Sequence, residues 1–202
     1  GFDADTYHAD MRYNFTSSII DWHYDYDAPV GPGLYDLYTT VLHEMTHALG
    51  FVSAFNNTEG LLGSRSGLGS YYAFDQFLQL TYASGSTENL IENGMPANGN
   101  SMSPEWFFNG MVDASSDLHS SCPGPGPDMT FDGGLGGHPI YTGTSFESGG
   151  SFSHLDGNCG APPNMIIPYV MHPTLGIQDE RRMFLDIELD IMRKLAYKIE
   201  CD

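Results

Sequence analysis

The chain is short of positive charge and has no long apolar segment. Seven Lys and Arg residues stand against 26 Asp and Glu residues, which gives a formal net charge of −19. A surface of that sign repels phosphate, so the composition argues against binding to nucleic acid. No apolar run reaches the roughly 18 residues that a membrane-spanning helix needs. The composition therefore suits a soluble, secreted protein.

The chain also lacks a signal peptide and any visible internal repeat. Its first residues, Gly1, Phe2 and Asp3, are typical of a mature or trimmed protein, so a secreted, extracellular location is inferred from composition and not from a targeting segment. A chain of 202 residues is long enough for one domain with a buried core. We therefore expect a single domain over residues 1–202.

The most informative segment is Val-Leu-His-Glu-Met-Thr-His-Ala-Leu-Gly-Phe at 41–51. On a helix, His43 and His47 lie about 40° apart around the axis, so both imidazoles can bind one ion. Glu44 lies beside that ion without binding it, where its carboxylate can accept a proton from a water molecule that the metal activates. The pattern predicts a catalytic zinc site with two histidine ligands and Glu44 as the general base.

The flanking residues predict that this segment is helical. Apolar side chains recur at i, i+3, i+4 and i+7 and would form one buried face, from which the histidines and Glu44 point away. Pro32 and Gly33 form a turn before the helix, Asp36 lies in its first turn, and Gly50 ends it in a left-handed conformation. The expected apolar face consists of Leu34, Tyr38, Val41, Leu42, Met45, Ala48 and Leu49.

A catalytic zinc site normally has three protein ligands and a water molecule, and this segment supplies two. The extended motif His-Glu-x-x-His-x-x-Gly-x-x-His would take its third ligand from position 53, which is Ser53. Thermolysin-like enzymes take a glutamate from a second helix downstream. Glu88 and Glu92 are the nearest candidates for that role, in a short stretch interrupted by Asn-Gly.

Two downstream histidines are the main candidates for the third ligand. His154 lies in Ser-Phe-Ser-His-Leu-Asp, and from the residues alone it ranks only modestly above His138 in Gly-Gly-His-Pro. Ser151, Ser153 and Asp156 offer short polar side chains that would orient the His154 ring.

Three segments, in this order, resemble the leishmanolysin-like branch of the metzincins and related secreted bacterial metalloproteases. They lie at 43–51, 151–156 and 169–175. In that branch, a long insertion follows the first segment, the second delivers the third zinc ligand, and the third forms a Met-turn beneath the metal. The resemblance implies zinc ligands at His43, His47 and His154, a general base at Glu44, and a Met-turn residue at Met171, with Met165 as the alternative.

The resemblance also implies a two-lobed α+β catalytic domain with zinc in the cleft. Residues 1–51 would form the upper lobe with the active-site helix, and 52–202 the lower lobe with the third ligand, the Met-turn and a last helix. Only 42 residues precede His43, about half of what such an upper lobe usually needs, so the N-terminal sheet is expected to be short or truncated. A propeptide or a further chain outside this sequence is an expected partner.

The implied function is a secreted zinc endopeptidase acting on protein or peptide substrates. The alternatives are a zinc exopeptidase or other zinc hydrolase, and a non-catalytic secreted metal-binding module. Related enzymes often place a tyrosine after the Met-turn methionine, but here His172 follows Met171. His172 is therefore a candidate to assist the reaction and a weaker candidate for the third ligand.

The remaining patterns predict a mixture of strands, helices and loops, which defines an α+β fold. Strands are expected over 11–16 and 22–24, and a short helix over 71–80. Residues 115–151 hold many Gly, Pro and Ser residues and predict irregular loops with short strands. The last helix is expected over 179–199.

The three cysteines include no Cys-x-x-Cys pair, which argues against a cysteine zinc cluster. Cys122 and Cys159 flank the insertion that carries His138 and His154, so we expect a disulfide between them. Cys201 would then be free or paired with a partner outside this chain.

Calcium is a second candidate metal. Asp25 with Asp27, and Asp128 with Asp132, are candidate ligands, although none lies in a recognised calcium loop and ordinary solvated carboxylates are the alternative.

Overall fold

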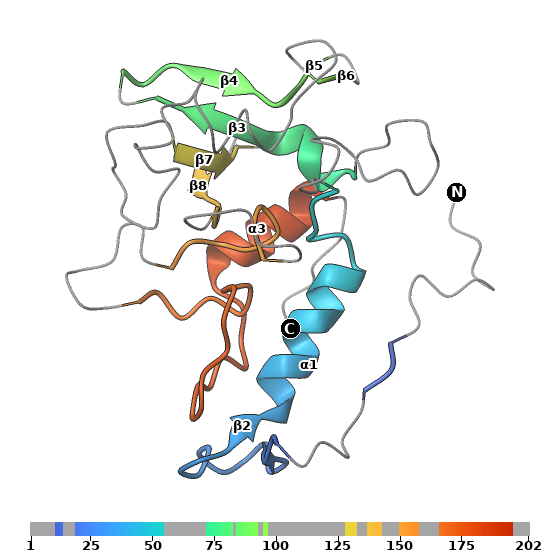
Figure 1. Cartoon of the computed structure of the whole chain (residues 1–202), viewed down its shortest axis with the longest axis vertical. Helices are drawn as coiled ribbons and strands as arrows, with labels where there is room; N and C mark the ends of the chain where they lie inside the picture. The colour runs from blue at the N-terminus through green and yellow to red at the C-terminus, as the bar shows by residue number, and fades with distance from the viewer. Residues whose placement is uncertain are drawn as a thin grey trace.

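The structure is a computed structural model that describes residues 11–13, 19–54, 72–82, 84–92, 95–96, 128–132, 137–142, 150–157 and 166–195. Within these ranges the fold is a mixture of two helices and three small sheets, which confirms the α+β class (Figure 1). No helix in these ranges is long and apolar enough to cross a membrane.

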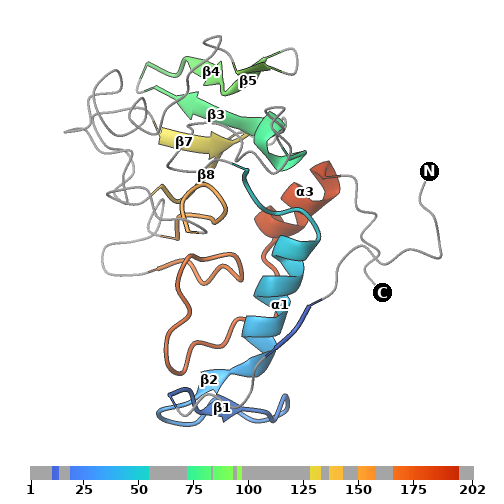
Figure 2. The same cartoon turned by 45° about the vertical axis from the view of Figure 1, so that its right-hand side comes forward.

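Helix α1 (Leu37–Ala48) carries the His-Glu-x-x-His motif. It follows directly on a two-stranded parallel sheet of β1 (Trp22–His23) and β2 (Tyr35–Asp36), seen at its lower end in Figures 1 and 2. Asp36 is the N-cap and lies before the first turn, where its carboxylate accepts a hydrogen bond from the Thr39 amide at 3.1 Å. Gly50 adopts a φ of 105° after the helix, the left-handed exit that the sequence predicted.

The buried face of α1 differs from the apolar stripe that the sequence predicted. Tyr38 and Met45 are 41% and 43% exposed, whereas Thr39, His43 and Thr46 are buried. Periodicity was misleading at these positions because the chain packs the polar side of α1 against the rest of the protein. The prediction that both histidines point away from the interior is therefore wrong for His43.

A four-stranded antiparallel sheet packs beyond the C-terminal end of α1, with strand order β4-β3-β7-β8 (Figures 1 and 2). Its strands are β3 (Leu78–Thr81), β4 (Thr87–Asn89), β7 (Asp128–Phe131) and β8 (His138–Pro139). A further pair, β5 (Ile91–Glu92) and β6 (Met95–Pro96), is also antiparallel. Strands β7 and β8 agree with the prediction of short strands in this glycine-rich region.

The prediction of a helix over 71–80 is wrong. A single 3-10 turn at Phe74–Phe77 leads directly into β3. Leu78 and Leu80 are fully buried while the residues between and after them are partly exposed, a period of two that pairing with β4 and β7 stabilises. Sheet pairing overrode the local pattern. The strand expected over 11–16 is also absent from 11–13, the part of it that the structure describes.

The last helix is shorter than predicted. Helix α3 covers Asp186–Lys194, so the expected start at residue 179 is wrong. Residues before it are held in other conformations by their side chains: Arg181 donates to the Tyr169 carbonyl at 3.0 Å, and Arg182 pairs with Asp36 at 2.9 Å. Its expected end lies outside the described residues.

One hydrophobic core joins these elements. It combines the inner face of the sheet, the chain leaving α1, the segment around residue 154, the segment 169–171 and α3. Its largest fully buried side chains are Phe51, Phe74, Phe131, Phe152, Leu78, Leu80, Leu90, Leu155, Met171 and Ile191. Segments that lie far apart in sequence therefore meet beside the C-terminal half of α1.

Several sequence predictions lie outside the described residues. They are the Cys122–Cys159 disulfide, the free Cys201 and the alternative Met-turn residue Met165.

Candidate metal centre

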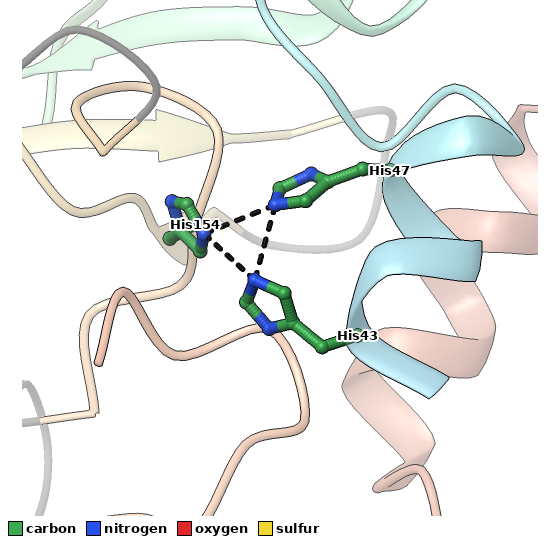
Figure 3. Close-up of side chains that lie close together, drawn as sticks. All are labelled: His43, His47 and His154. Atoms are coloured by element: carbon green, nitrogen blue, oxygen red, sulfur yellow. Dashed lines mark hydrogen bonds between the residues drawn. The ribbon is translucent and has the colours of Figure 1, made fainter. Parts of the chain in front are cut away.

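Three histidines converge at one point of the structure. His43 and His47 project from successive turns of α1, and His154 meets them from a loop on the opposite side (Figure 3). The Nε2 atoms of His43 and His47 are 3.1 Å apart, those of His47 and His154 are 3.1 Å apart, and those of His43 and His154 are 3.2 Å apart. The structure thus brings together the three histidines that the family resemblance implied as zinc ligands, in a cluster that could hold a metal ion.

Each of these rings is held by a backbone carbonyl at its other nitrogen. The Nδ1 atoms of His43, His47 and His154 lie 2.7 Å from the carbonyl oxygens of Val170, Phe51 and Gly150, respectively. A carbonyl oxygen only accepts hydrogen bonds, so each Nδ1 must carry the proton and donate it. A neutral ring that is held in this way presents an unprotonated Nε2, which is the tautomer that a metal ion needs.

This arrangement fits a bound cation. Three Nε2 lone pairs facing one another at 3.1–3.2 Å repel unless a positive charge lies between them. A tetrahedral zinc ion with Zn–N bonds of about 2.0–2.1 Å has N···N edges of about 3.3–3.4 Å, close to the observed separations. The triad is the single group of His, Cys, Asp and Glu side chains among the described residues that is close enough to hold a metal ion.

The electrostatics also favour neutral ligands. Burial lowers the pKa of His154 to about 3, and the neighbouring His47 and His43 add to this effect. Burial likewise lowers the pKa of His43, against the hydrogen bond to Val170, which raises it. A metal ion competes with protons for imidazole nitrogens, so lowering the proton affinity keeps the site ready for metal at mildly acidic pH.

Side-chain hydrogen bonds hold the loop that carries His154. The Ser151 hydroxyl donates to the Thr142 carbonyl at 2.7 Å, and the Ser153 hydroxyl accepts from the Ser53 amide at 3.0 Å. Phe152 takes a φ of 67°, which costs a non-glycine residue about 1 kcal/mol, and its fully buried ring offsets that cost. The Nδ1 atom of His154 is held by the Gly150 backbone carbonyl, and Ser151 and Ser153 hold the loop; the suggestion that Ser151, Ser153 or Asp156 orients the ring stays a prediction.

A buried carboxylate braces the exit from α1 and was not identified from the sequence. Asp75 accepts hydrogen bonds from the Ser53 hydroxyl at 2.6 Å, the Tyr72 amide at 2.8 Å and the Ala54 amide at 3.1 Å. Ser53 therefore links the chain that leaves α1 both to Asp75 and to the loop that carries His154. No motif surrounds Asp75, so no sequence signal distinguishes it from a solvated aspartate.

Glu44 is exposed and lines the same open hollow as the three histidines, a space of about 490 Å³. A second hollow of about 560 Å³ also has Glu44 and His47 in its wall, together with Tyr13 and Trp22. The Glu44 carboxylate, next to His43 in sequence, therefore reaches solvent at the mouth of this hollow.

The rival ligands lie elsewhere. His138 is on β8, and His172 keeps its Nδ1 within 3.0–3.2 Å of the Thr174 backbone and lines a different hollow. Glu88 lies on strand β4 and accepts a hydrogen bond from the Tyr82 hydroxyl at 2.9 Å, so it does not fit the thermolysin-like alternative, in which a ligand glutamate lies on a second helix. Both remaining histidine candidates are therefore outside the triad.

The candidate calcium residues do not form a metal group among the described residues. The Asp25 carboxylate accepts from the Asp27 amide at 3.0 Å, a local turn contact. The side chain of Asp128 is not described, and Asp132 belongs to no group of ligands.

Met171 is fully buried and follows directly on Val170, whose carbonyl holds His43. The Met171 carbonyl accepts a hydrogen bond from the Leu155 amide at 2.8 Å, next to His154. The segment thus contacts the supports of two of the three histidines. Gly157 lies close to the same region, where a Cβ atom would come within 2.7 Å of the Ile167 carbonyl oxygen.

No protein-family model, curated protein or solved structure matches this chain.

Proposed function

We propose that the chain is a secreted zinc-dependent endopeptidase of the metzincin type. The observation that carries the proposal is the convergence of three histidine Nε2 atoms, within 3.1–3.2 Å of one another, at a hollow that Glu44 also lines. The acidic composition supports secretion, and the order of the three matched segments supports the family.

The donor set favours a catalytic over a structural metal. Structural zinc sites are usually closed by four protein ligands, whereas catalytic sites keep one position open for water or substrate. The described residues supply three ligands, and the triad borders an open hollow. Three neutral imidazoles suit zinc, and a Glu beside the first of them is where hydrolysis by a metal-activated water needs a base.

Zinc bound by these histidines would polarise a peptide carbonyl and activate a water molecule for attack on it. Glu44 accepts the proton that this water loses as its oxygen bonds to the carbonyl carbon. The same carboxyl group then returns the proton to the amide nitrogen, and the C–N bond breaks to release an amine and a carboxylic acid. Because Glu44 is exposed, it can exchange protons with solvent between turnovers.

A polypeptide is the proposed substrate. Glu44 and His47 border two hollows, which provides room for chain on more than one side of the cleaved bond and favours an endopeptidase over an exopeptidase. In the proposed two-lobed arrangement, Met171 is the Met-turn residue. The hydrogen bond that His43 donates to the carbonyl of the preceding residue supports that assignment.

The test is Glu44→Gln, which keeps the size of the side chain and removes the base. We expect the variant to bind one zinc ion per chain and to lose about a hundredfold to ten-thousandfold of its activity on a generic protein substrate, since general acid-base catalysis typically contributes about 10²–10⁴-fold. Asp190→Asn, which changes an exposed carboxylate on α3, is the matched control and should keep full activity.

Retained activity in zinc-loaded Glu44→Gln would refute the role of Glu44. A zinc-loaded wild-type protein that cleaves no peptide bond would instead favour the non-catalytic metal-binding module. Release of single terminal residues only would favour an exopeptidase.

A further inference from the structure

A buried carboxyl group on α3 contacts the segment that supports the metal site. Glu188 is 0% exposed. Its Oε2 accepts a hydrogen bond from the Leu185 amide at 2.9 Å, which caps its own helix, and its Oε1 accepts one from the Met171 amide at 2.8 Å. Burial raises the pKa of Glu188 to about 7, while the amides of Met171, Leu185 and Val170 lower it.

The contact with Met171 reaches a ligand through a single peptide bond. The Met171 N–H and the Val170 C=O belong to the same planar peptide unit, and they point in opposite directions because the peptide is trans. Glu188 accepts from one end of this unit, and the Nδ1–H of His43 donates to the other end at 2.7 Å. Fixing the N–H end therefore fixes the direction of the carbonyl that orients His43.

The same segment also supports His154. The Met171 carbonyl accepts from the Leu155 amide at 2.8 Å, directly after the ligand. Two of the three ligands thus depend on the placement of Val170 and Met171. Glu188 contacts this dipeptide through a charged or strongly polar group in a buried setting, where hydrogen bonds are strong and polarise their neighbours.

We infer that Glu188 is a positioning residue for the metal centre, which it serves by holding the Val170–Met171 peptide so that His43 and His154 keep their orientation. This inference rests on the proposed metal site and assigns a task to α3 within it. Groups that orient metal ligands from outside the ligand sphere typically change metal affinity by 10–100-fold when they are replaced.

A residue that is only part of the core would behave differently. Its replacement would lower the free energy of unfolding but would leave the affinity and spectrum of the folded protein unchanged. The experiment therefore measures metal binding to the folded, metal-free protein at 25 °C, by competition with a chromophoric chelator for Zn(II) and by titration with Co(II), whose visible absorption reports ligand geometry.

Two variants test the inference. Glu188→Gln keeps the shape of the side chain but replaces one carboxylate oxygen by an NH₂ group. This group cannot accept the hydrogen bond from the Met171 or Leu185 amide that it faces. Glu188→Met fills a similar volume with no buried polar group, so it remains informative if the glutamine variant does not fold. We expect both folded variants to bind Zn(II) about 10–100-fold more weakly and to change the Co(II) absorption bands. Asp190→Asn on the same helix should match the wild type.

Wild-type affinity and an unchanged Co(II) spectrum in either folded variant would overturn the inference. Failure of the wild type to bind metal would overturn both the inference and the proposed function. Metal binding that depends on Glu188 in a protein without peptidase activity would support the inference and reject the proposed function.

Discussion

Replacing Asp75 by asparagine should remove a pH-dependent part of the protein's stability. The Asp75 side chain is fully buried and receives three hydrogen bonds, from Ser53, Ala54 and Tyr72. Burial raises the pKa of this carboxyl from 3.8 to about 6, against the three hydrogen bonds, which lower it. The desolvation cost of the charged form therefore exceeds the stabilisation that these donors provide.

The sign and size follow from linkage between protonation and folding. Since the pKa in the folded state is higher than in the unfolded state, the contribution of Asp75 is fully present below pH 3.8 and is lost as the pH rises through about 6. A shift of about two units corresponds to about 3 kcal/mol in total, of which about 2 kcal/mol falls between pH 4.5 and 7.5.

The assay is urea unfolding of the metal-free wild type and Asp75→Asn at several pH values from about 4.5 to 7.5. The difference in free energy of unfolding, wild type minus variant, should fall by about 2 kcal/mol over this range. Taking the difference cancels the titration of the histidines, which both proteins share. Asp190→Asn, which replaces a carboxylate that is not buried, is the matched control. A flat or rising difference for Asp75→Asn would refute the argument that burial dominates at this site.

Three further outcomes are expected. His154→Ala should lose its zinc and its activity while His138→Ala keeps both, as measured by metal content and turnover; the opposite result would remove His154 from the site. Burial lowers the pKa of His154 in the folded state to about 3, from its ordinary value of 6.5. The contribution of His154 to the free energy of unfolding is therefore fully present above pH 6.5 and is lost as the pH falls towards 3. Co(II) absorption should accordingly survive at about pH 6 and vanish on further acidification, and its loss already at about pH 7 would contradict this. Arg182→Gln leaves the buried Asp36 without its ion pair and should lower the free energy of unfolding in urea by about 2–3 kcal/mol. Arg193→Gln breaks an exposed ion pair and should lower it by less than about 1 kcal/mol. Equal losses in the two variants would refute the distinction between buried and exposed pairs.

The sequence alone identified the local part of the candidate metal centre. Two histidines four residues apart on a helix must lie on neighbouring turns, so the convergence of His43 and His47 follows from helix geometry. The left-handed exit at Gly50 is equally local, because glycine adopts that conformation without steric cost. The α+β class followed from the mixture of patterns along the chain.

Local periodicity failed where tertiary contacts determine the structure. Residues 78–81 form a strand because β4 and β7 pair with them, and the last helix starts at Asp186 because Arg181 and Arg182 hold the preceding residues in other contacts. The apolar stripe of α1 was predicted correctly at Leu42 and Leu49, which pack against the core, but not at Tyr38 and Met45, which are exposed. Hydrophobic periodicity does not detect a buried polar face such as the one that Thr39, His43 and Thr46 form.

The supports of the metal centre could be recognised only in the tertiary structure. His154 meets the α1 histidines across more than 100 residues of sequence, and from its residues alone it was hardly distinguishable from His138. The groups that orient the three rings are the backbone carbonyls of Gly150, Phe51 and Val170, and a carbonyl is the same in every residue. Side-chain identity therefore specified which atoms can bind a metal, while the path of the backbone through the folded core decided which of them are brought together and held.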